Sequence, residues 1–213
     1  MQLISCKKKN CLVCDLPDSK IKEIAEGVKR GKLVIYPTET LYGLGANPFD
    51  ESAIKKVYMA KRRPFDMPLS IAVRDVNMLE ELAVLDNKSR KLFLKFTPGP
   101  ITILVVKKGN IPDILTSALP EIGIRIPDHP LALRLIEQCG PIISTSANLH
   151  SHPDPTTAQM AITDIGNEVD YCIDCGPCRV GKPSTIVQVT DNGIEIIRQG
   201  AIPRETIEAA LDE

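Results

Sequence analysis

Helical and strand-like hydrophobic patterns alternate along the whole chain. Residues 20–30 place Ile21, Ile24 and Val28 on one helical face, and Gly31 then precedes a strand at 32–36. The same patterns recur and predict further helices after residue 50 and at 78–85, 89–96, 131–139 and 205–211, with strands at 69–73, 101–106, 122–126, 141–144, 185–189 and 194–197. Elements interspersed in this way indicate an α/β fold without an internal repeat or a dividing linker.

The second predicted helix ends in a basic cluster. Asp50 is a suitable N-cap, and Lys61 continues the apolar face that includes Tyr58. Pro64 stops the helix, so Lys61 and Arg63 lie at its last turn and just beyond it. A lysine offers a polyphosphate a point charge and an arginine offers it a planar fork. Two solvated cations favoured by the helix C-terminus explain the same residues equally well.

Polar segments follow several of the predicted strands. They are residues 38–40, Arg125, residues 144–148 and residues 184–185, and they are rich in hydroxyl and amide groups. Because strand ends line the ligand crevice of open α/β sheets, these distant segments are expected to converge there. Their chemistry suits a small substrate with a carboxylate and an amine. The competing interpretation is that the hydroxyls only cap helices.

Length and composition narrow the class of protein. A chain of 213 residues fits one domain, and 26 Lys and Arg against 27 Asp and Glu give a net charge of -1. That balance argues against nonspecific binding to nucleic acid or anionic membranes, so any anion site is local. Neither a signal peptide nor a membrane-spanning stretch is recognisable, which predicts a cytoplasmic protein with no membrane partner. The seven cysteines are then expected to be thiols or metal ligands instead of disulfides.

Six motifs in order resemble those of the YrdC/TsaC family, the L-threonylcarbamoyladenylate synthases. They are PTETLYGLG at 37–45, KRRP at 61–64, PGPIT at 98–102, RIPDHP at 125–130, STSAN at 144–148 and STIV at 184–187. The resemblance implies a YrdC-like single domain over residues 1–213, in which a twisted mixed sheet with packed helices forms an open concave groove. The motif-bearing core covers about 17–203, and no additional C-terminal domain is expected.

The resemblance also implies a reaction. L-threonine, bicarbonate or CO2, and ATP give threonylcarbamoyl-AMP and pyrophosphate, and the activated group passes to tRNA through a separate threonylcarbamoyl transferase. The carbamate of threonine attacks the α-phosphorus, which requires positioning and charge neutralisation more than a protein nucleophile. Mg²⁺ is expected on the ATP, held largely by phosphate and water. A contact with tRNA or double-stranded RNA is a further partner prediction.

Motif positions of the family fall on eight residues of this chain. The nucleotide-binding set falls on Lys61, Arg63, Ser146, Asn148 and Arg198, with Lys61 and Arg63 offsetting charge on the reacting phosphates; the threonine-binding set falls on Thr40, Arg125 and Ser184. We expect Lys61 and Arg63 to be partly exposed in the cleft. No protein metal ligands are expected.

Six cysteines lie in or near C-x-x-C spacings, the pattern that zinc and iron–sulfur sites use. They are Cys6, Cys11, Cys14, Cys172, Cys175 and Cys178. Because the family builds the second of these regions without metal, thiols are favoured over a structural metal. His129 precedes a predicted helix and is expected in a turn or cap, whereas His150 and His152 are expected to be exposed loop residues.

Two alternatives to the synthase remain open. Many family members have asparagine and histidine where this chain has Met67 and Ala72, so a paralogue with another substrate is one alternative. The other is an RNA-binding module with a basic concave face, built from Lys61, Arg62, Arg63, Arg125, Arg179 and Lys182.

Overall fold

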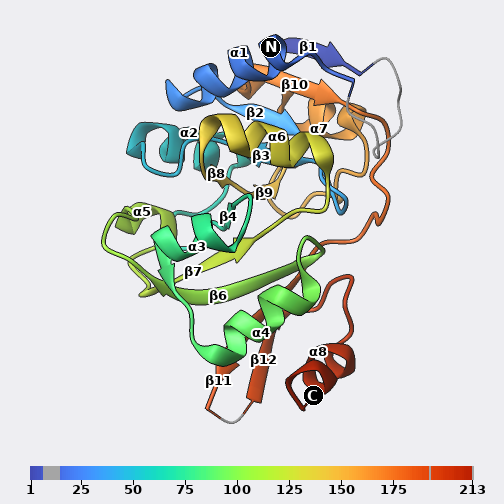
Figure 1. Cartoon of the computed structure of the whole chain (residues 1–213). Helices are drawn as coiled ribbons and strands as arrows, with labels where there is room; N and C mark the ends of the chain where they lie inside the picture. Colours follow the sequence, from blue (N-terminus) through green and yellow to red (C-terminus); the bar gives the residue numbers. More distant parts are fainter. Residues whose placement is uncertain (7–14, 192, 213) are drawn as a thin grey trace.

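The computed structural model describes residues 1–6, 15–191 and 193–212 and shows two mixed sheets with helices packed around them (Figure 1). The helices are α1 (Asp18–Lys29), α2 (Glu51–Lys61), α3 (Val76–Leu82), α4 (Asn87–Phe96), α5 (Asp113–Thr116), α6 (Pro130–Cys139), α7 (Ala158–Ile165), the 3-10 turn η1 (Gly166–Glu168) and α8 (Arg204–Asp212). The strands are β1 (Gln2–Ser5), β2 (Val34–Tyr36), β3 (Gly43–Gly45), β4 (Ile71–Ala72), β5 (Ala83–Val84), β6 (Ile101–Lys107), β7 (Glu121–Arg125), β8 (Ile142–Ile143), β9 (Thr145–Ser146), β10 (Tyr171–Asp174), β11 (Thr185–Thr190) and β12 (Gly193–Arg198).

The first sheet has the strand order β1-β10-β2-β3-β9 and occupies the upper half of Figure 1. β1, β10 and β2 are parallel neighbours, whereas β3 is antiparallel to β2 and β9. Side chains alternate along β2, so Val34 and Tyr36 face α1 and α6 while Ile35 faces the cluster that includes α2. Helices therefore cover both faces of this sheet.

The second sheet has the order β12-β11-β6-β7-β4-β8, with β5 paired to β6. β6 is parallel to β11 and antiparallel to β7. Ile103 on β6, Phe93 on α4 and Ile207 on α8 belong to the larger of the two apolar clusters. That cluster continues into the first sheet, so a common core joins the two sheets.

The chain crosses from one sheet to the other at Ser144. β8 ends just before this residue in the second sheet and β9 begins just after it in the first. The Ser144 amide donates to the Ser70 carbonyl (2.8 Å), and the Ile143 amide donates to the Ala46 carbonyl (2.9 Å). Strand ends of both sheets therefore meet in this region.

The predicted α/β class with helices packed against mixed sheet is confirmed, and the strands are divided between two sheets. The strand expected at 141–144 is present as the shorter β8, which ends at the crossing at Ser144. The predicted helices at α1, α2, α3, α4, α6 and α8 are all present, and Asp50 caps α2 by accepting from the Ser52 and Ala53 amides. The elements that were not predicted are β1, β3, β5, β9, β10, α5 and α7. β3 contains two glycines and shows no strand pattern in the sequence. Gly45 allows a close approach of its neighbours, because a Cβ at this position would lie only 2.5 Å from the Ile142 side chain.

The length and hydropathy of the helices bear on whether any of them could cross a membrane. Among residues 1–6, 15–191 and 193–212, none of the helices is both long enough and apolar enough to cross a membrane.

Candidate active site

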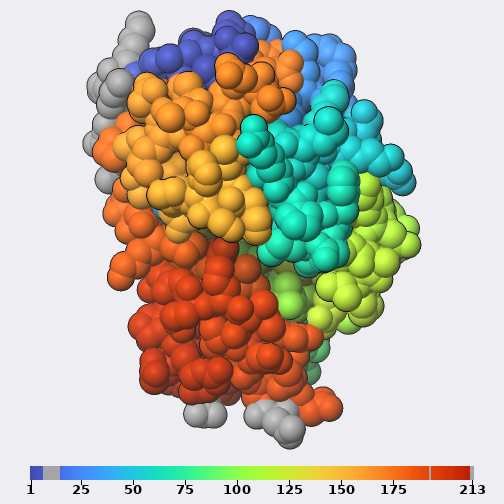
Figure 2. Space-filling model, turned by 180° about the vertical axis from the view of Figure 1, so that it is seen from behind, coloured from blue at the N-terminus to red at the C-terminus, as the bar shows by residue number. Residues whose placement is uncertain are grey.

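An open pocket lies where the two sheets meet. Its empty volume is about 700 Å³, part of which is open to solvent, and its lining comes from residues 38, 40–43, 63, 68–70, 102, 125, 144–146, 183, 184, 186 and 198. In Figure 2 the surface is hollowed where the teal, orange and red stretches meet, with green residues visible between them. The polar segments predicted to converge from distant strand ends do so here. The predicted open concave groove is this pocket.

The turn after β2 is held by its own hydroxyl groups. Thr38 Oγ1 accepts from the amides of Thr40 and Leu41 (both 3.2 Å) and donates to the Leu41 carbonyl (2.6 Å). It also lies 2.9 Å from Thr40 Oγ1. These bonds fold residues 38–41 into a tight loop, which fixes the Thr40 hydroxyl at the pocket wall.

Arg125 reaches this turn from the end of β7. Its Nη1 donates to Thr40 Oγ1 (3.1 Å), and its Nη2 pairs with Glu39 Oε1 (2.6 Å). Arg125 is only 7% exposed and Glu39 only 1%. Glu39 Oε2 also accepts from the Asp128 amide (3.1 Å), so both carboxylate oxygens are occupied. Arg125 Nε is buried without a hydrogen-bond partner in the described part of the chain.

Ser184 and Arg198 form the opposite wall. Ser184 Oγ lies 2.8 Å from Thr102 Oγ1 and accepts from Arg198 Nη2 (3.1 Å). The guanidinium of Arg198 also donates to the Ser184 carbonyl through Nη2 (2.8 Å) and Nε (3.3 Å). The predicted threonine-site residue Ser184 and the predicted nucleotide contact Arg198 are thus joined directly.

Lys61, Ser146 and Asn148 form a third cluster. Lys61 Nζ donates to the Asn148 carbonyl (2.6 Å), to Asn148 Oδ1 (3.0 Å) and to the Ser146 carbonyl. Ser146 Oγ donates to the same Asn148 Oδ1 (2.7 Å). The expectation that Lys61 is partly exposed is wrong, because its side chain is only 2% exposed. The reason is that the last turn of α2 packs against residues 146–148, so the ammonium lies behind the pocket wall that Ser146 forms.

Arg63 lies in the pocket itself, half-buried as expected. Its Nε donates to the Met67 carbonyl (3.2 Å) and its Nη2 to the Pro68 carbonyl (3.0 Å). Arg62, at the end of α2, adopts a left-handed conformation with φ of 49° that turns the chain towards this position. The guanidinium is therefore oriented before any ligand arrives.

Positive charge accumulates around this pocket. Burial, together with the nearby charge of Arg63, lowers the pKa of Lys61 to about 7. Burial also lowers the pKa of Arg198; exposed Asp154 opposes that shift, while Arg125 and Arg63 add to it. Among the described residues that line the pocket there is no carboxylate, and the charge of the buried Glu39 is balanced by its ion pair with Arg125. The pocket thus favours an anionic ligand.

All eight predicted site residues lie at or next to the pocket. Seven of them are joined by hydrogen bonds within the three clusters described above, and the eighth, Arg63, lines the pocket separately. Six residues line it, and Lys61 and Asn148 lie immediately behind Ser146. Sequence reasoning assigned no role to Glu39 or Thr102. The signal for Glu39 was its place between two threonines directly after an apolar strand.

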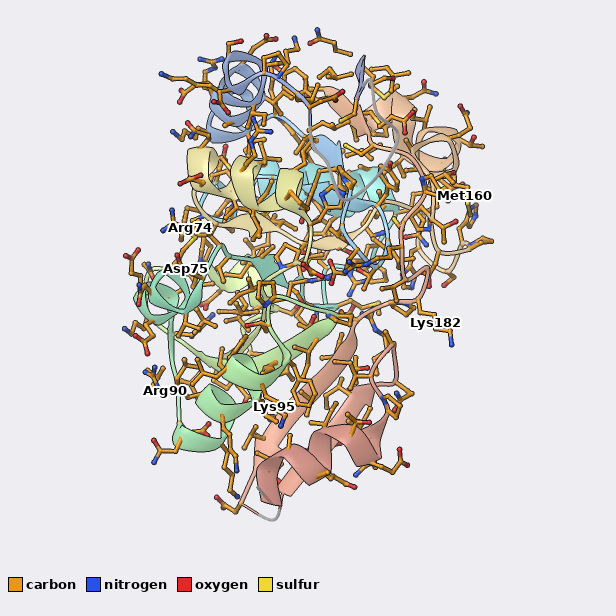
Figure 3. All side chains as sticks on the ribbon, turned by 45° about the vertical axis from the view of Figure 1, so that its right-hand side comes forward. Arg74, Asp75, Arg90, Lys95, Met160 and Lys182 are labelled. Carbon is orange, nitrogen blue, oxygen red and sulfur yellow. The ribbon has the colours of Figure 1, made fainter. Side chains whose placement is uncertain are left out.

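The basic face of the RNA-binding alternative does not form as predicted. Lys61 and Arg125 are buried, and Arg179 pairs with Asp128. Lys182 is exposed, and Figure 3 shows its side chain extending away from the segment between β10 and β11. Only part of the proposed set therefore lies on the surface.

His129 and His152 behave as expected, whereas His150, expected to be exposed, is only partly exposed. His129 is the N-cap of α6, where its Nδ1 accepts from the Leu131 amide (3.2 Å), and burial lowers its pKa to about 4. His152 is exposed and lies 3.3 Å from Asp164. These roles leave the histidines outside the pocket lining.

The cysteines separate into groups. Cys11 and Cys14 lie outside the described residues. Cys172 and Cys178 pack with the larger apolar cluster, whereas Cys6 and Cys175 belong to the smaller one. Within residues 1–6, 15–191 and 193–212, no three or more His, Cys, Asp or Glu side chains gather in a way that would hold a metal ion.

Comparisons with known proteins agree with this architecture. The model of the Sua5/YciO/YrdC family, described as "Telomere recombination", matches residues 26–200. A relative from Methanocaldococcus jannaschii is 43% identical over 92% of this chain and 95% of its own length. The threonylcarbamoyl-AMP synthase of Pyrococcus abyssi is 39% identical over 91% of this chain, which spans only 58% of that protein.

Solved structures show the same fold. The crystal structure of P. abyssi Sua5 complexed with L-threonine has a TM-score of 0.92 at 36% identity, covering 99% of this chain and 61% of that one. The crystal structure of Escherichia coli YciO has a TM-score of 0.84 at 25% identity, covering 97% and 98%. Every residue that lines the pocket falls inside the stretch that the family model matches. On these grounds the chain belongs to the Sua5/YciO/YrdC family.

Proposed function

We propose that this protein is a threonylcarbamoyl-AMP synthase, which joins L-threonine, bicarbonate or CO2, and ATP into threonylcarbamoyl-AMP with release of pyrophosphate. The observation that carries the proposal is a pocket in which Arg63, Arg125 and Arg198 face one cavity without a carboxylate in its lining. A relative named threonylcarbamoyl-AMP synthase and a similar structure complexed with L-threonine support it. The product serves N6-threonylcarbamoyladenosine formation in tRNA through a separate transferase.

The threonine end of the pocket is assigned to Arg125, Thr40 and Ser184. Arg125 lines the pocket and offers a guanidinium to a substrate carboxylate, and its buried Nε has no hydrogen-bond partner in the described chain. The other two guanidinium nitrogens are already fixed by Thr40 and Glu39. A clamp held in this way loses little conformational entropy when it binds its ligand.

The phosphate end is assigned to Arg63 and Arg198, with Ser146 orienting the nucleotide and Asn148 positioning Ser146 from behind the pocket wall. Arg63 is held by two carbonyls, and this geometry suits the neutralisation of phosphate charge without reorganisation. Lys61 lies behind the pocket wall that Ser146 forms. There it holds residues 146–148 in place and adds positive charge to the wall. Its proximity to a polyphosphate would raise its pKa again.

The reaction then depends mainly on placement. The threonine amine and CO2 form a carbamate, and a carbamate oxygen attacks the α-phosphorus of ATP while pyrophosphate leaves. Holding both reactants in one pocket converts the encounter into an intramolecular step. Mg²⁺ bound to the phosphates would supply further charge neutralisation, and because the lining lacks carboxylates, phosphate and water would be its main ligands.

A direct assay tests the proposal. The purified protein is incubated with ATP, Mg²⁺, bicarbonate and L-threonine, and pyrophosphate and the adenylate are measured. We expect both products only when threonine and bicarbonate are present together. Arg63→Ala should lose most turnover while keeping its circular dichroism spectrum, because Arg63 is only half-buried.

The alternatives give different outcomes. Product with L-serine but not with L-threonine would identify a paralogue with another substrate. No turnover, combined with salt-sensitive affinity for tRNA, would identify an RNA-binding module. Either result would remove the synthase proposal.

A further inference from the structure

Two hydroxyl groups meet in the wall of the pocket, and the proposed function uses only one of them. Thr102 Oγ1 lies 2.8 Å from Ser184 Oγ. Both residues line the pocket, although Thr102 is only 2% exposed and Ser184 only 4%. Ser184 belongs to the threonine end of the pocket, whereas Thr102 has no role so far. This hydroxyl pair therefore offers a ligand more polar contacts than Ser184 alone provides.

The register of the second sheet places Thr102 beside Arg125. β6 and β7 are adjacent and antiparallel, with Ile103 opposite Ile124 (Figure 1). Extending that register by one residue brings Thr102 opposite Arg125. Directly opposed residues of an antiparallel pair project from the same face, with their Cβ atoms about 4.5–5.5 Å apart. Thr102 is therefore the neighbour on β6 of the residue assigned to the substrate carboxylate.

A glycine on β7 explains why the Thr102 hydroxyl points towards Ser184. A Cβ added to Gly123 would lie 3.1 Å from the Thr102 methyl carbon Cγ2 and 2.5 Å from Ser70 Oγ. The methyl group of Thr102 therefore occupies the space above Gly123, on the β7 side of β6. Because a β-branched side chain has few χ1 rotamers, the hydroxyl is left on the β11 side, where it meets Ser184.

The hydrogen bonds around the hydroxyl pair leave one donor over. Ser184 Oγ accepts from Arg198 Nη2 (3.1 Å), and the two hydroxyls share one hydrogen bond with each other. Two hydroxyls carry two hydrogens, so one hydrogen is left whichever of the two donates. Within the described part of the chain, neither hydroxyl has another acceptor. The pair can therefore donate to a ligand oxygen and also accept from it, which is what a ligand hydroxyl requires.

Contacts of the next residue on β11 hold the pair in position. The Thr185 amide donates to the Pro100 carbonyl (3.0 Å), which fixes the start of β11 against the start of β6. Thr185 Oγ1 donates to the Ile202 carbonyl (2.7 Å) and accepts from the Gly200 amide (3.2 Å). A Cβ on Gly200 would lie only 2.4 Å from the Pro183 carbonyl oxygen, so these segments are in close contact. Polar groups held in this way lose little conformational entropy when a ligand binds.

We propose, on the basis of the proposed function, that Thr102 is the specificity-determining residue that recognises the side-chain hydroxyl of the amino-acid substrate. In threonine, the carbon that carries the hydroxyl is bonded to the carbon that carries the carboxylate. A carboxylate held by Arg125 therefore keeps the hydroxyl near the neighbours of Arg125. On β4 that neighbour is Ala72, which offers no side-chain hydrogen bond, and on β6 it is Thr102. Ile186, opposite Thr102 on β11, lines the pocket and offers the threonine methyl group an apolar contact.

Kinetics with two amino acids test the role of Thr102. Pyrophosphate release is measured with ATP, Mg²⁺, bicarbonate and either L-threonine or L-2-aminobutyrate, which has the same carbon skeleton without the hydroxyl. The wild type should show a kcat/KM about a hundredfold or more higher with L-threonine, because the analogue leaves buried polar groups unpaired. Thr102→Val keeps the volume and removes the hydroxyl. It should lower kcat/KM for L-threonine about tenfold or more and change the value for L-2-aminobutyrate far less. Thr102→Ser, the matched control, keeps the hydroxyl and should keep the preference for L-threonine.

Several results would overturn this assignment while leaving the synthase activity in place. One is a folded Thr102→Val that loses the same factor with both amino acids. Another is a Thr102→Val that mainly raises the KM for ATP, which would assign the hydroxyl pair to the nucleotide. A wild type that uses both amino acids equally well would overturn the assignment without any variant, so the test does not depend on Thr102→Val folding.

Failure of the proposed function gives a different result, since the wild type would then release no pyrophosphate with either amino acid. Titration calorimetry with L-threonine and L-2-aminobutyrate would still test Thr102 in that case. A preference of the wild type for L-threonine that Thr102→Val loses and Thr102→Ser keeps would support the assignment. Equal dissociation constants for the two amino acids, or no binding of either, would overturn it.

Discussion

Lys61 permits a quantitative test of how burial and hydrogen bonding compete. Its ammonium has three acceptor oxygens, which favour the charged form, while burial lowers its pKa to about 7. In the unfolded chain a lysine has a pKa of about 10.4. Between these values the unfolded state binds more protons than the folded one, so the free energy of unfolding must rise with pH.

Lys61→Met isolates this effect, because methionine keeps most of the apolar stem and removes the titrating group. Between the folded and unfolded pKa values of Lys61, each pH unit changes the free energy of unfolding by about 1.36 kcal/mol. From pH 7 to pH 9 the wild type should therefore gain about 2–3 kcal/mol of stability relative to Lys61→Met. The variant loses hydrogen bonds to three buried acceptors, which costs about 1 kcal/mol or more for each. That loss has the same size at both pH values.

Urea unfolding followed by circular dichroism at the two pH values measures the difference. Lys55→Met is the matched control, because Lys55 is exposed on the same helix and its replacement should have the same small effect at both pH values. A stability difference between wild type and Lys61→Met that does not change with pH would refute the reasoning. It would mean that the three oxygens keep the ammonium charged in spite of its burial.

Three further predictions concern ligand binding. At pH 8 the binding of ATP should be accompanied by proton uptake, because polyphosphate raises the lowered pKa of Lys61; calorimetry in buffers of different ionisation enthalpy measures it, and Lys61→Met should abolish it. Arg125→Ala should raise the KM for threonine far more than the KM for ATP, and equal effects would remove its role as the carboxylate anchor. Glu39→Gln should weaken the hold on Arg125 and raise the KM for threonine about tenfold or more, since a charge-assisted hydrogen bond contributes about 1.5–3 kcal/mol. An unchanged KM would show that Thr40 alone positions the guanidinium.

Local structure was predicted well from the sequence for a physical reason. A helix or strand buried on one face repeats its apolar residues with a fixed period, and α1, α2 and α6 carry that pattern clearly. The N-cap role of Asp50 likewise depends on only three residues. Where the period is absent, as in the glycine-rich β3, the element was missed, because its stability comes from neighbouring strands.

The sequence by itself determined the α/β class, most helices and the polar segments that end strands. The tertiary structure alone decided that there are two sheets, that Lys61 is buried against Asn148 87 residues away, and that Cys6 meets Cys175. The physical reason is that exposure, pKa and ligand geometry depend on contacts between segments far apart in the chain. Those contacts follow from strand order and register, which no local pattern encodes.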